Sequence, residues 1–240
     1  MDQTPILSLR DIHKSFGPVH VLKGVYFDAY PGEVTALVGD NGAGKSTLVR
    51  LIAGLEPADG GSLSLFGSDL PSRFSADDIA ARGVAFIHQN LGLVEDMSVA
   101  ENIAMAAGYA KNGPFISWRN TRKRALRALE IMGVDLNPDA LVGELPMSLR
   151  SITAIGRALM GSPQLLLLDE PAAGMNPQES LELMHLIRRL RDEFHLTVLL
   201  VEHNMKVVMG VCERIHVLDY GDRKSTRLNS SHGYISYAVF

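Results

Sequence analysis

GDNGAGKST, residues 39–47, is the stretch that decides the fold. It fits the pattern G-x-x-x-x-G-K-[ST] of a phosphate-binding loop. The apolar run EVTALVG (33–39) before it predicts a strand, and residues 45–55 after it have helical periodicity. A strand, a glycine-rich loop and a helix in this order place backbone N–H groups and a helix N-terminus around an anion. A glycine-rich turn with a chance lysine is the alternative, and the flanking strand and helix argue against it.

The loop carries side chains suited to a nucleoside triphosphate and its metal ion. Lys45 can reach the β- and γ-phosphates, the Ser46 hydroxyl can ligate Mg²⁺, and Thr47 adds a contact on the α-phosphate side. We therefore expect ATP and Mg²⁺ as ligands. The expected nucleotide-binding residues of the loop are Gly39, Asn41, Gly42, Ala43, Gly44, Lys45, Ser46 and Thr47.

Two carboxylates end the apolar run LLLLDE, residues 165–170. Ligands of open α/β sheets bind at the carboxyl ends of the strands. We expect Asp169 to hold Mg²⁺, directly or through water, and Glu170 to polarise the attacking water as general base. An acidic turn after a strand is common when it stands alone, but together with the phosphate-binding loop it predicts a hydrolytic site.

Outward from this stretch, apolar runs alternate with helical patterns. The alternation predicts an α/β fold, a P-loop core with a mainly parallel sheet. The family resemblance described below adds the expectation of an N-terminal antiparallel β portion. Residues 91–160 break the alternation and are mostly helical. We interpret them as an inserted helical subdomain.

The composition narrows the class of protein further. The formal net charge of −4 over 240 residues argues against a broad nucleic-acid-binding surface. The single cysteine, Cys212, cannot form an internal disulfide, which suits a reducing compartment. No apolar run approaches the roughly 18 residues of a membrane span, and the first thirty residues have no secretory pattern. We expect a cytoplasmic chain whose membrane role, if it has one, depends on a partner.

Over residues 5–221 the chain resembles the nucleotide-binding subunit of ATP-binding cassette (ABC) transporters. The resemblance implies that Phe16, in IHKSFG, stacks on adenine. It implies that Gln89, in FIHQN, senses Mg²⁺ and the γ-phosphate and faces a membrane subunit. It implies that His203, in LLVEHN, contacts the γ-phosphate. The expected catalytic set is Glu170, His203 and Gln89, and the expected Mg²⁺ set is Ser46, Gln89 and Asp169.

The family resemblance also implies a head-to-tail dimer, in which each ATP lies between the P-loop of one subunit and a signature, Leu-Ser-x-Gly-Gln, of the other. Here the signature reads LPMSL, residues 145–149. Pro146 offers neither hydroxyl nor N–H, whereas Ser148 keeps an N–H that can bind the nucleotide. Losing one charge-assisted contact costs about 1.5–3 kcal/mol, or about tenfold to a hundredfold in rate. We expect a weakened signature, and Asn176 stands where the family has an aspartate.

Two importer classes are represented along the chain. Residues 5–160 resemble the sugar-importer class and residues 165–221 the branched-chain amino-acid importer class. A divergent single-cassette subunit and two genes joined near residue 160 both explain this division. Residues 222–240 do not continue the pattern of the domain, and we predict that they are a non-native tail resembling translated adapter sequence.

The resemblance implies an ATP-hydrolysing importer subunit that drives uptake of a small solute, with sugar the first expectation and branched-chain amino acid the second. The implied partners are membrane permease subunits, a second nucleotide-binding domain (identical or different) and, indirectly, a solute-binding protein. The chain would lie peripherally on the inner face of the cell membrane. A cassette that binds ATP but hydrolyses it weakly, in a regulatory role, is one alternative. A soluble ABC ATPase outside transport is the other.

Overall fold

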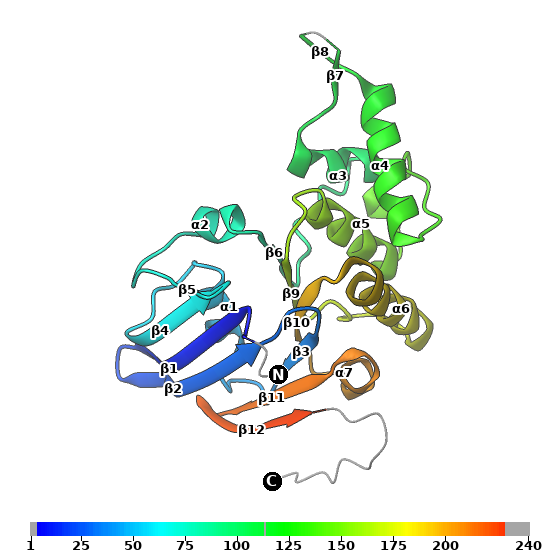
Figure 1. Cartoon of the computed structure of the whole chain (residues 1–240). Coiled ribbons are helices and arrows are strands. Elements are labelled where there is room, and N and C mark those ends of the chain that lie inside the picture. The colour runs from blue at the N-terminus through cyan, green and yellow to red at the C-terminus, as the bar shows by residue number, and fades with distance from the viewer. Residues whose placement is uncertain (1–3, 113, 229–240) are drawn as a thin grey trace.

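A computed structural model shows the architecture and describes residues 4–112 and 114–228 (Figure 1). Two sheets of more than two strands occur in this part of the chain. The first is antiparallel, in the order β2-β1-β4-β5. Its strands are β1 (Leu7–Phe16), β2 (Val19–Ala29), β4 (Gly60–Leu65) and β5 (Ser68–Asp69). It is the N-terminal antiparallel portion that the sequence predicts.

The second sheet has the order β12-β11-β3-β10-β9-β6, and all its neighbours are parallel except β11 and β12. Its strands are β3 (Val34–Val38), β6 (Val84–Ile87), β9 (Leu165–Asp169), β10 (Thr197–Val201), β11 (Arg214–Asp219) and β12 (Asp222–Leu228). The predicted α/β fold with a mainly parallel sheet is confirmed.

The apolar runs of the central strands follow from burial on both faces of this sheet. Side chains alternate between the faces, so Leu166 and Leu168 of β9 enter the core shared with the helices. Leu165 and Leu167 enter the core shared with the antiparallel sheet and α1 (Lys45–Ile52). A strand covered on both sides needs apolar residues at every position, which explains the run LLLL.

The remaining helices lie mainly on the other side of the sheet or beyond it (Figure 1). They are α2 (Ala76–Ala81), α3 (Val99–Ala107), α4 (Trp118–Met132), α5 (Met147–Leu159), α6 (Pro177–Phe194) and α7 (Met205–Val211). A 3-10 turn (Val142–Glu144) precedes α5, and the short strands β7 (Lys111–Asn112) and β8 (Phe115–Ile116) form a hairpin between α3 and α4. Capping boxes begin α3, at Ser98 with Glu101, and α6, at Asn176 with Glu179.

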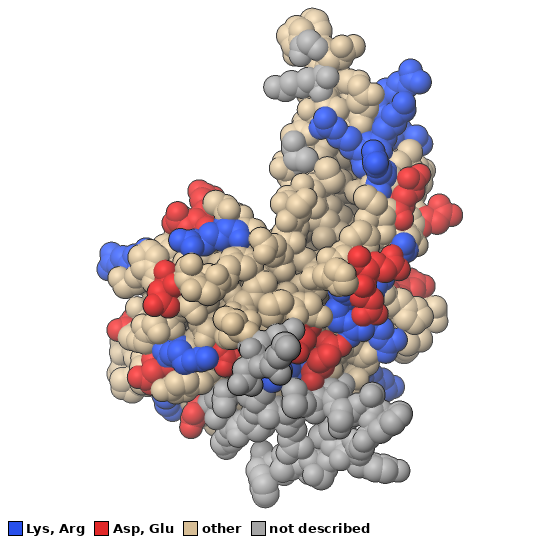
Figure 2. Space-filling model, in the orientation of Figure 1, with Lys and Arg blue, Asp and Glu red and all other residues tan. Residues whose placement is uncertain are grey.

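The helices α3, α4 and α5 pack together and stand apart from the sheets (Figure 1). They fall within the range 91–160 expected to be a helical subdomain, although its boundaries stay a prediction. Figure 2 shows Lys and Arg side chains gathered on this portion, whereas both signs of charge are interspersed over the sheet portion. Among the described residues, no helix is both long enough and apolar enough to cross a membrane.

The structure differs from the sequence analysis directly after Gly221. Residues 222–228 were expected to leave the pattern of the domain, yet they form the edge strand β12, which pairs antiparallel with β11. Backbone N–H and C=O groups make this ladder, so an extended segment can supply it without a matching side-chain pattern. The pairing does not test the origin of residues 222–240, and residues 229–240 lie outside the described part of the chain.

Candidate active site

The predicted site residues follow four neighbouring parallel strands and lie at the carboxyl ends of these strands. The P-loop follows β3, His203 lies just after β10, Asp169 and Glu170 end β9, and Gln89 lies just after β6. The register pairs Val201 of β10 with Asp169. Because parallel strands bring their carboxyl ends to the same edge, segments more than a hundred residues apart in sequence meet there.

The P-loop packs closely around its own lysine. The Lys45 ammonium donates hydrogen bonds to the carbonyl oxygens of Gly39, at 2.6 Å, and Asp40, at 3.0 Å. Gly44 begins α1 with φ 102°, and a Cβ there would lie 3.1 Å from the Val21 carbonyl oxygen. Only glycine fits this combination of backbone and contact. The loop therefore presents a buried cation beside the helix N-terminus, the arrangement that phosphate binding requires.

Glu170 connects the remaining predicted catalytic residues. Its Oε2 accepts a hydrogen bond of 3.1 Å from Gln89 Nε2, and its Oε1 lies 3.8 Å from His203 Nδ1. The Glu170 backbone is in the left-handed region, at φ 49°, and its N–H donates to the Val201 carbonyl at 2.9 Å. A non-glycine residue in this conformation is strained, and such strain clusters at functional sites. The sequence-predicted set of Glu170, Gln89 and His203 is thus brought together.

Asp169 lies in an environment that disfavours its negative charge. Burial, followed by the adjacent charge of Glu170, raises the pKa of Asp169 above its usual range, while Lys45 acts in the opposite direction. The charge of Glu202 raises this pKa further. A cation beside Asp169 would relieve this repulsion, since an opposite charge favours the ionised carboxylate.

The surroundings of Asp169 fit Mg²⁺. Carboxylate, amide and hydroxyl oxygens are its usual protein ligands, and it keeps several waters and substrate phosphates in its shell. In the part of the chain that the structure describes, no cluster of three or more His, Cys, Asp or Glu side chains could hold a metal alone. The predicted Mg²⁺ residues Ser46, Gln89 and Asp169 stay a prediction.

Phe16 stands at the end of β1, with its ring 45% exposed. It pairs in register with Val19 of β2, and β2 continues to Val21, which approaches Gly44 of the P-loop. The hairpin end that carries Phe16 therefore runs beside the P-loop. The Lys14 ammonium lies 5.3 Å from the ring centroid. Phe16 is exposed enough for stacking, and its contact with adenine, which the family resemblance implies, stays a prediction.

The structure keeps the signature segment away from the P-loop of the same chain. Pro146 is the N-cap of α5 and provides no side-chain cap. Ser148 is only 2% exposed, whereas Met147 is 38% exposed. α1 packs into the core that faces the antiparallel sheet, whereas α5 packs into the core on the other face of the parallel sheet. Because the exposed fraction of Ser148 is for the whole residue, its backbone and side chain are both covered, and a contact with the nucleotide of a second chain requires a rearrangement.

Asn176 has a role that the sequence analysis did not foresee. Its side-chain oxygen accepts the Glu179 N–H at 2.9 Å, and the Glu179 carboxylate accepts the Asn176 N–H at 2.8 Å. The asparagine that stands where the family has an aspartate thus caps α6 within its own chain.

Sequence reasoning missed Glu202. It follows β10 directly, is 1% exposed, and accepts hydrogen bonds from three backbone N–H groups. The only sequence signal was a charged residue beside His203 at the end of an apolar strand. One of the three donors, Ala172, is thirty residues away in sequence, so the pattern did not indicate it.

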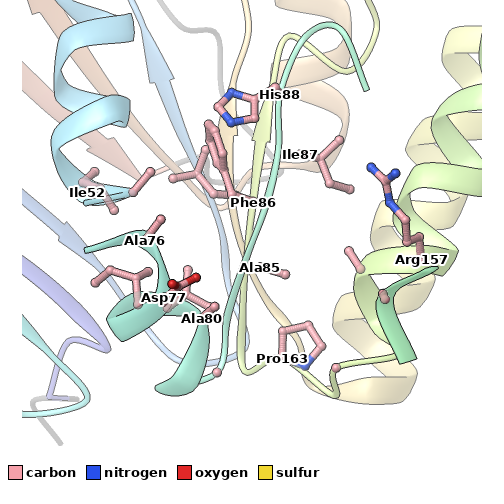
Figure 3. Close-up of a pocket in the computed structure, with 18 of the residues that line it drawn as sticks. Ile52, Ala76, Asp77, Ala80, Ala85, Phe86, Ile87, His88, Arg157 and Pro163 are labelled. Carbon is pink, nitrogen blue, oxygen red and sulfur yellow. The ribbon is translucent and has the colours of Figure 1, made fainter. Parts of the chain in front are cut away.

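A cleft of about 430 Å³ opens between the sheet portion and the helical portion (Figure 3). Ile52 of α1, Ala80 of α2, Phe86 of β6 and Arg157 of α5 line it. His88 lies in this region against Phe86, with ring centroids 3.9 Å apart. Burial lowers the pKa of His88, so the neutral ring is favoured.

Arg157 connects this cleft to the segment that follows Gln89. Its guanidinium donates to the carbonyl oxygens of Gly92, at 2.7 Å, and Leu91, at 2.6 Å. Burial lowers the pKa of Arg157 from its usual value. The helix that begins at the signature is thereby tied to the segment that follows Gln89.

The P-loop before α1 and the carboxylates at the end of β9 define a P-loop nucleotide-binding protein. A protein-family profile described as ABC transporter matches residues 22–173. The chain belongs to the ABC transporter family, which confirms the resemblance deduced from the motifs.

Two curated relatives are ribose import ATP-binding proteins. The one from Caldanaerobacter subterraneus subsp. tengcongensis is 37% identical over 217 residues, which are 90% of this chain and 43% of the relative. The one from Chelativorans sp. is 37% identical over 225 residues, 93% of this chain and 43% of the relative. The chain thus spans less than half the length of these relatives. Their names agree with the predicted sugar-importer resemblance, while the branched-chain resemblance of residues 165–221 stays a prediction.

Solved structures agree with this assignment. A nucleotide-free ATP-binding cassette from an ABC transporter has a TM-score of 0.81 and 26% identity, covering 95% of this chain and 93% of the other. The ADP conformation of an ABC-transporter cassette also has a TM-score of 0.81 and 26% identity, covering 94% and 92%.

Proposed function

We propose that this chain is the ATP-hydrolysing subunit of an ABC importer that drives sugar uptake. The observation that carries the proposal is the arrangement of Glu170 between Gln89 and His203. All three follow the carboxyl ends of parallel strands, as the P-loop does after β3. Glu170 accepts a proton from the attacking water, and Gln89 orients its carboxylate. Lys45 neutralises charge on the β- and γ-phosphates, and His203 contacts the γ-phosphate.

The nucleotide and its ion use the residues described above. The P-loop holds the phosphates of ATP, and Phe16 stacks on the adenine ring. Ser46, Gln89 and Asp169 hold Mg²⁺, which supplies positive charge beside the phosphates. The raised pKa of Asp169 supports this assignment, because burial and Glu170 make a cation favourable there.

A second nucleotide-binding domain completes the site. The placement of α1 and α5 in two different cores supports this, because the helix that follows the P-loop and the helix that begins in the signature cover opposite faces of the parallel sheet. We propose a head-to-tail pair in which residues 145–149 of each chain face the ATP of the other, with Ser148 contributing its N–H. The partner is an identical chain or a different cassette.

Membrane permease subunits are the second proposed partner. The cleft between the two portions supports this, because its lining is largely apolar and Arg157 joins it to Leu91 and Gly92, near Gln89 (Figure 3). A permease segment seated there would sense the state of the catalytic site through Gln89. The chain would then lie on the inner face of the membrane, and a solute-binding protein would act indirectly through the permease.

The proposed solute is a sugar, with a branched-chain amino acid as second candidate. The relatives named for ribose import support the first. Residues 5–221 are the proposed extent of the cassette, with residues 91–160 as its helical subdomain.

Hydrolysis of Mg-ATP by the purified full-length chain, at several protein concentrations, tests the proposal beside Glu170→Gln. We expect activity that rises more than linearly with concentration, because two chains form each site. We expect Glu170→Gln to lose at least about a hundredfold in rate while still binding a fluorescent ATP analogue, since the P-loop is unchanged. Equal rates in both proteins would refute the role of Glu170.

A cassette that binds ATP and hydrolyses it weakly is the second candidate. Pro146 favours it, because an N-cap without a hydroxyl offers less to the γ-phosphate of a partner chain. Binding of the analogue with no hydrolysis at any concentration would support this candidate over the first.

A further inference from the structure

Glu202 is the buried carboxylate of the site that the proposed reaction does not use. It lies directly after β10 and is 1% exposed. Its Oε1 accepts the Ala172 N–H at 2.9 Å. Its Oε2 accepts the N–H groups of His203 and Asn204, both at 3.1 Å. A buried carboxylate needs such donors, because desolvation without compensation is costly.

These three hydrogen bonds join two segments that carry catalytic residues. Ala172 is the second residue after Glu170, and His203 and Asn204 begin the segment after β10. A further hydrogen bond links the same two segments, because the Glu170 N–H donates to the Val201 carbonyl oxygen at 2.9 Å. The Glu202 carboxylate therefore fixes the backbone on both sides of the Glu170–His203 pair.

The chemistry of these contacts requires a carboxylate. Its two oxygens act only as acceptors and can receive several N–H groups at once. Glutamine has one acceptor oxygen, and its NH₂ group would face an N–H donor. Aspartate keeps the charge and both acceptors but is one methylene shorter, so it can reach only some of the donors.

We propose that Glu202 is a positioning residue that holds His203 and the segment after Glu170 in the geometry needed for ATP hydrolysis. It acts through the three backbone N–H groups that it accepts. The inference rests on the proposed function, since the rate it affects is hydrolysis at Glu170. His203 stays largely exposed and depends on its backbone for its direction, because its side chain is 64% exposed.

The test compares Glu202→Gln and Glu202→Asp with a matched control, Glu213→Gln, in the full-length chain. Glu213 is also a carboxylate that accepts a backbone N–H, that of Val34 at 2.7 Å, but it lies at the opposite end of the sheet. We expect Glu202→Gln to lower kcat about tenfold or more with the KM for ATP within about twofold of the parent. Glu202→Asp should recover part of kcat, and Glu213→Gln should keep kcat within about twofold.

Amide hydrogen exchange at Ala172, His203 and Asn204 provides a readout that does not depend on activity. We expect faster exchange at these amides in Glu202→Gln and unchanged exchange in Glu213→Gln. If the parent does not hydrolyse ATP, the proposed function fails while exchange still decides whether Glu202 positions these segments. If Glu202→Gln does not fold, Glu202→Asp carries the same comparison. Unchanged exchange, or a kcat that falls equally in Glu202→Gln and Glu213→Gln, would overturn the inference.

Discussion

Replacing Pro146 by serine isolates the chemistry of the signature from its effect on the fold. Pro146 is the N-cap of α5, with φ −62° and ψ 160°, and it makes no side-chain cap. Serine adopts the same backbone conformation and can accept an N–H from the first turn, which stabilises a helix by about 1 kcal/mol. The loss of proline makes the unfolded chain less restricted and costs about 0.4–1 kcal/mol.

These two effects nearly cancel, so the melting temperature of Pro146→Ser should stay within about 2 °C of the parent. The rate of hydrolysis should change much more. A hydroxyl directed at the γ-phosphate of a partner chain adds one charge-assisted hydrogen bond, about 1.5–3 kcal/mol. At 1.36 kcal/mol for each factor of ten, the rate should rise about tenfold to a hundredfold.

The assay is Mg-ATP hydrolysis over a range of protein concentrations, together with thermal unfolding of each variant. Pro146→Ala is the matched control, because it restores the N–H without a hydroxyl and lacks a capping group. We expect Pro146→Ala to melt lower than Pro146→Ser and to hydrolyse ATP at a rate close to the parent. An equal gain in both variants would attribute the effect to the backbone, and no gain in either would show that Pro146 does not face a phosphate.

Three further predictions follow from the environments of single residues. Burial and neighbouring carboxylates raise the pKa of Asp169. The folded chain therefore binds the carboxyl proton of Asp169 more tightly than the unfolded chain does. As the pH rises and this carboxyl ionises, the free energy of unfolding decreases. Asp169→Asn should therefore raise the melting temperature of nucleotide-free protein near neutral pH yet remove most Mg-ATP hydrolysis; a lower melting temperature would contradict the electrostatic argument. Gly39→Ala would place a Cβ 2.2 Å from the Leu218 carbonyl oxygen and should cost about 1–3 kcal/mol in urea unfolding, more than Gly42→Ala, whose Cβ meets nothing within 4 Å. Burial raises the pKa of Cys212 to about 12, so less than about 1% is thiolate at pH 8.5, and alkylation should become rapid only after denaturation.

The sequence indicated the phosphate-binding loop and the acidic pair because each lies in a short, contiguous motif, whereas Gln89 and His203 were proposed from the order of the family's motifs. GDNGAGKST contains the loop, the lysine and the first turn of α1 together, so local chemistry was enough to identify it. Asp169 and Glu170 stand at the end of an apolar run, and burial on both faces of the sheet explains that run. The α/β class followed from the alternation of such strands with helices.

The edge strand after Gly221 shows where side-chain patterns are a poor guide. β12 pairs with β11 through backbone groups, and the sequence of residues 222–228 carries no alternation that would predict it. The capping role of Asn176 was missed for a related reason, since an asparagine suits either a helix N-terminus or a contact with another chain.

By itself, the sequence determined the phosphate-binding loop, the acidic pair and the α/β class, because these depend on residues that are neighbours in the chain; the weakened signature stays a prediction. Only the tertiary structure decided the strand order, which brings Gln89 Nε2 within 3.1 Å of Glu170 Oε2, and the placement of α1 and α5 in different cores. It also decided the role of Glu202, whose partner Ala172 is thirty residues away. Strand pairing and carboxylate-to-backbone hydrogen bonds join segments that no local pattern relates, so they become visible only when the chain is folded.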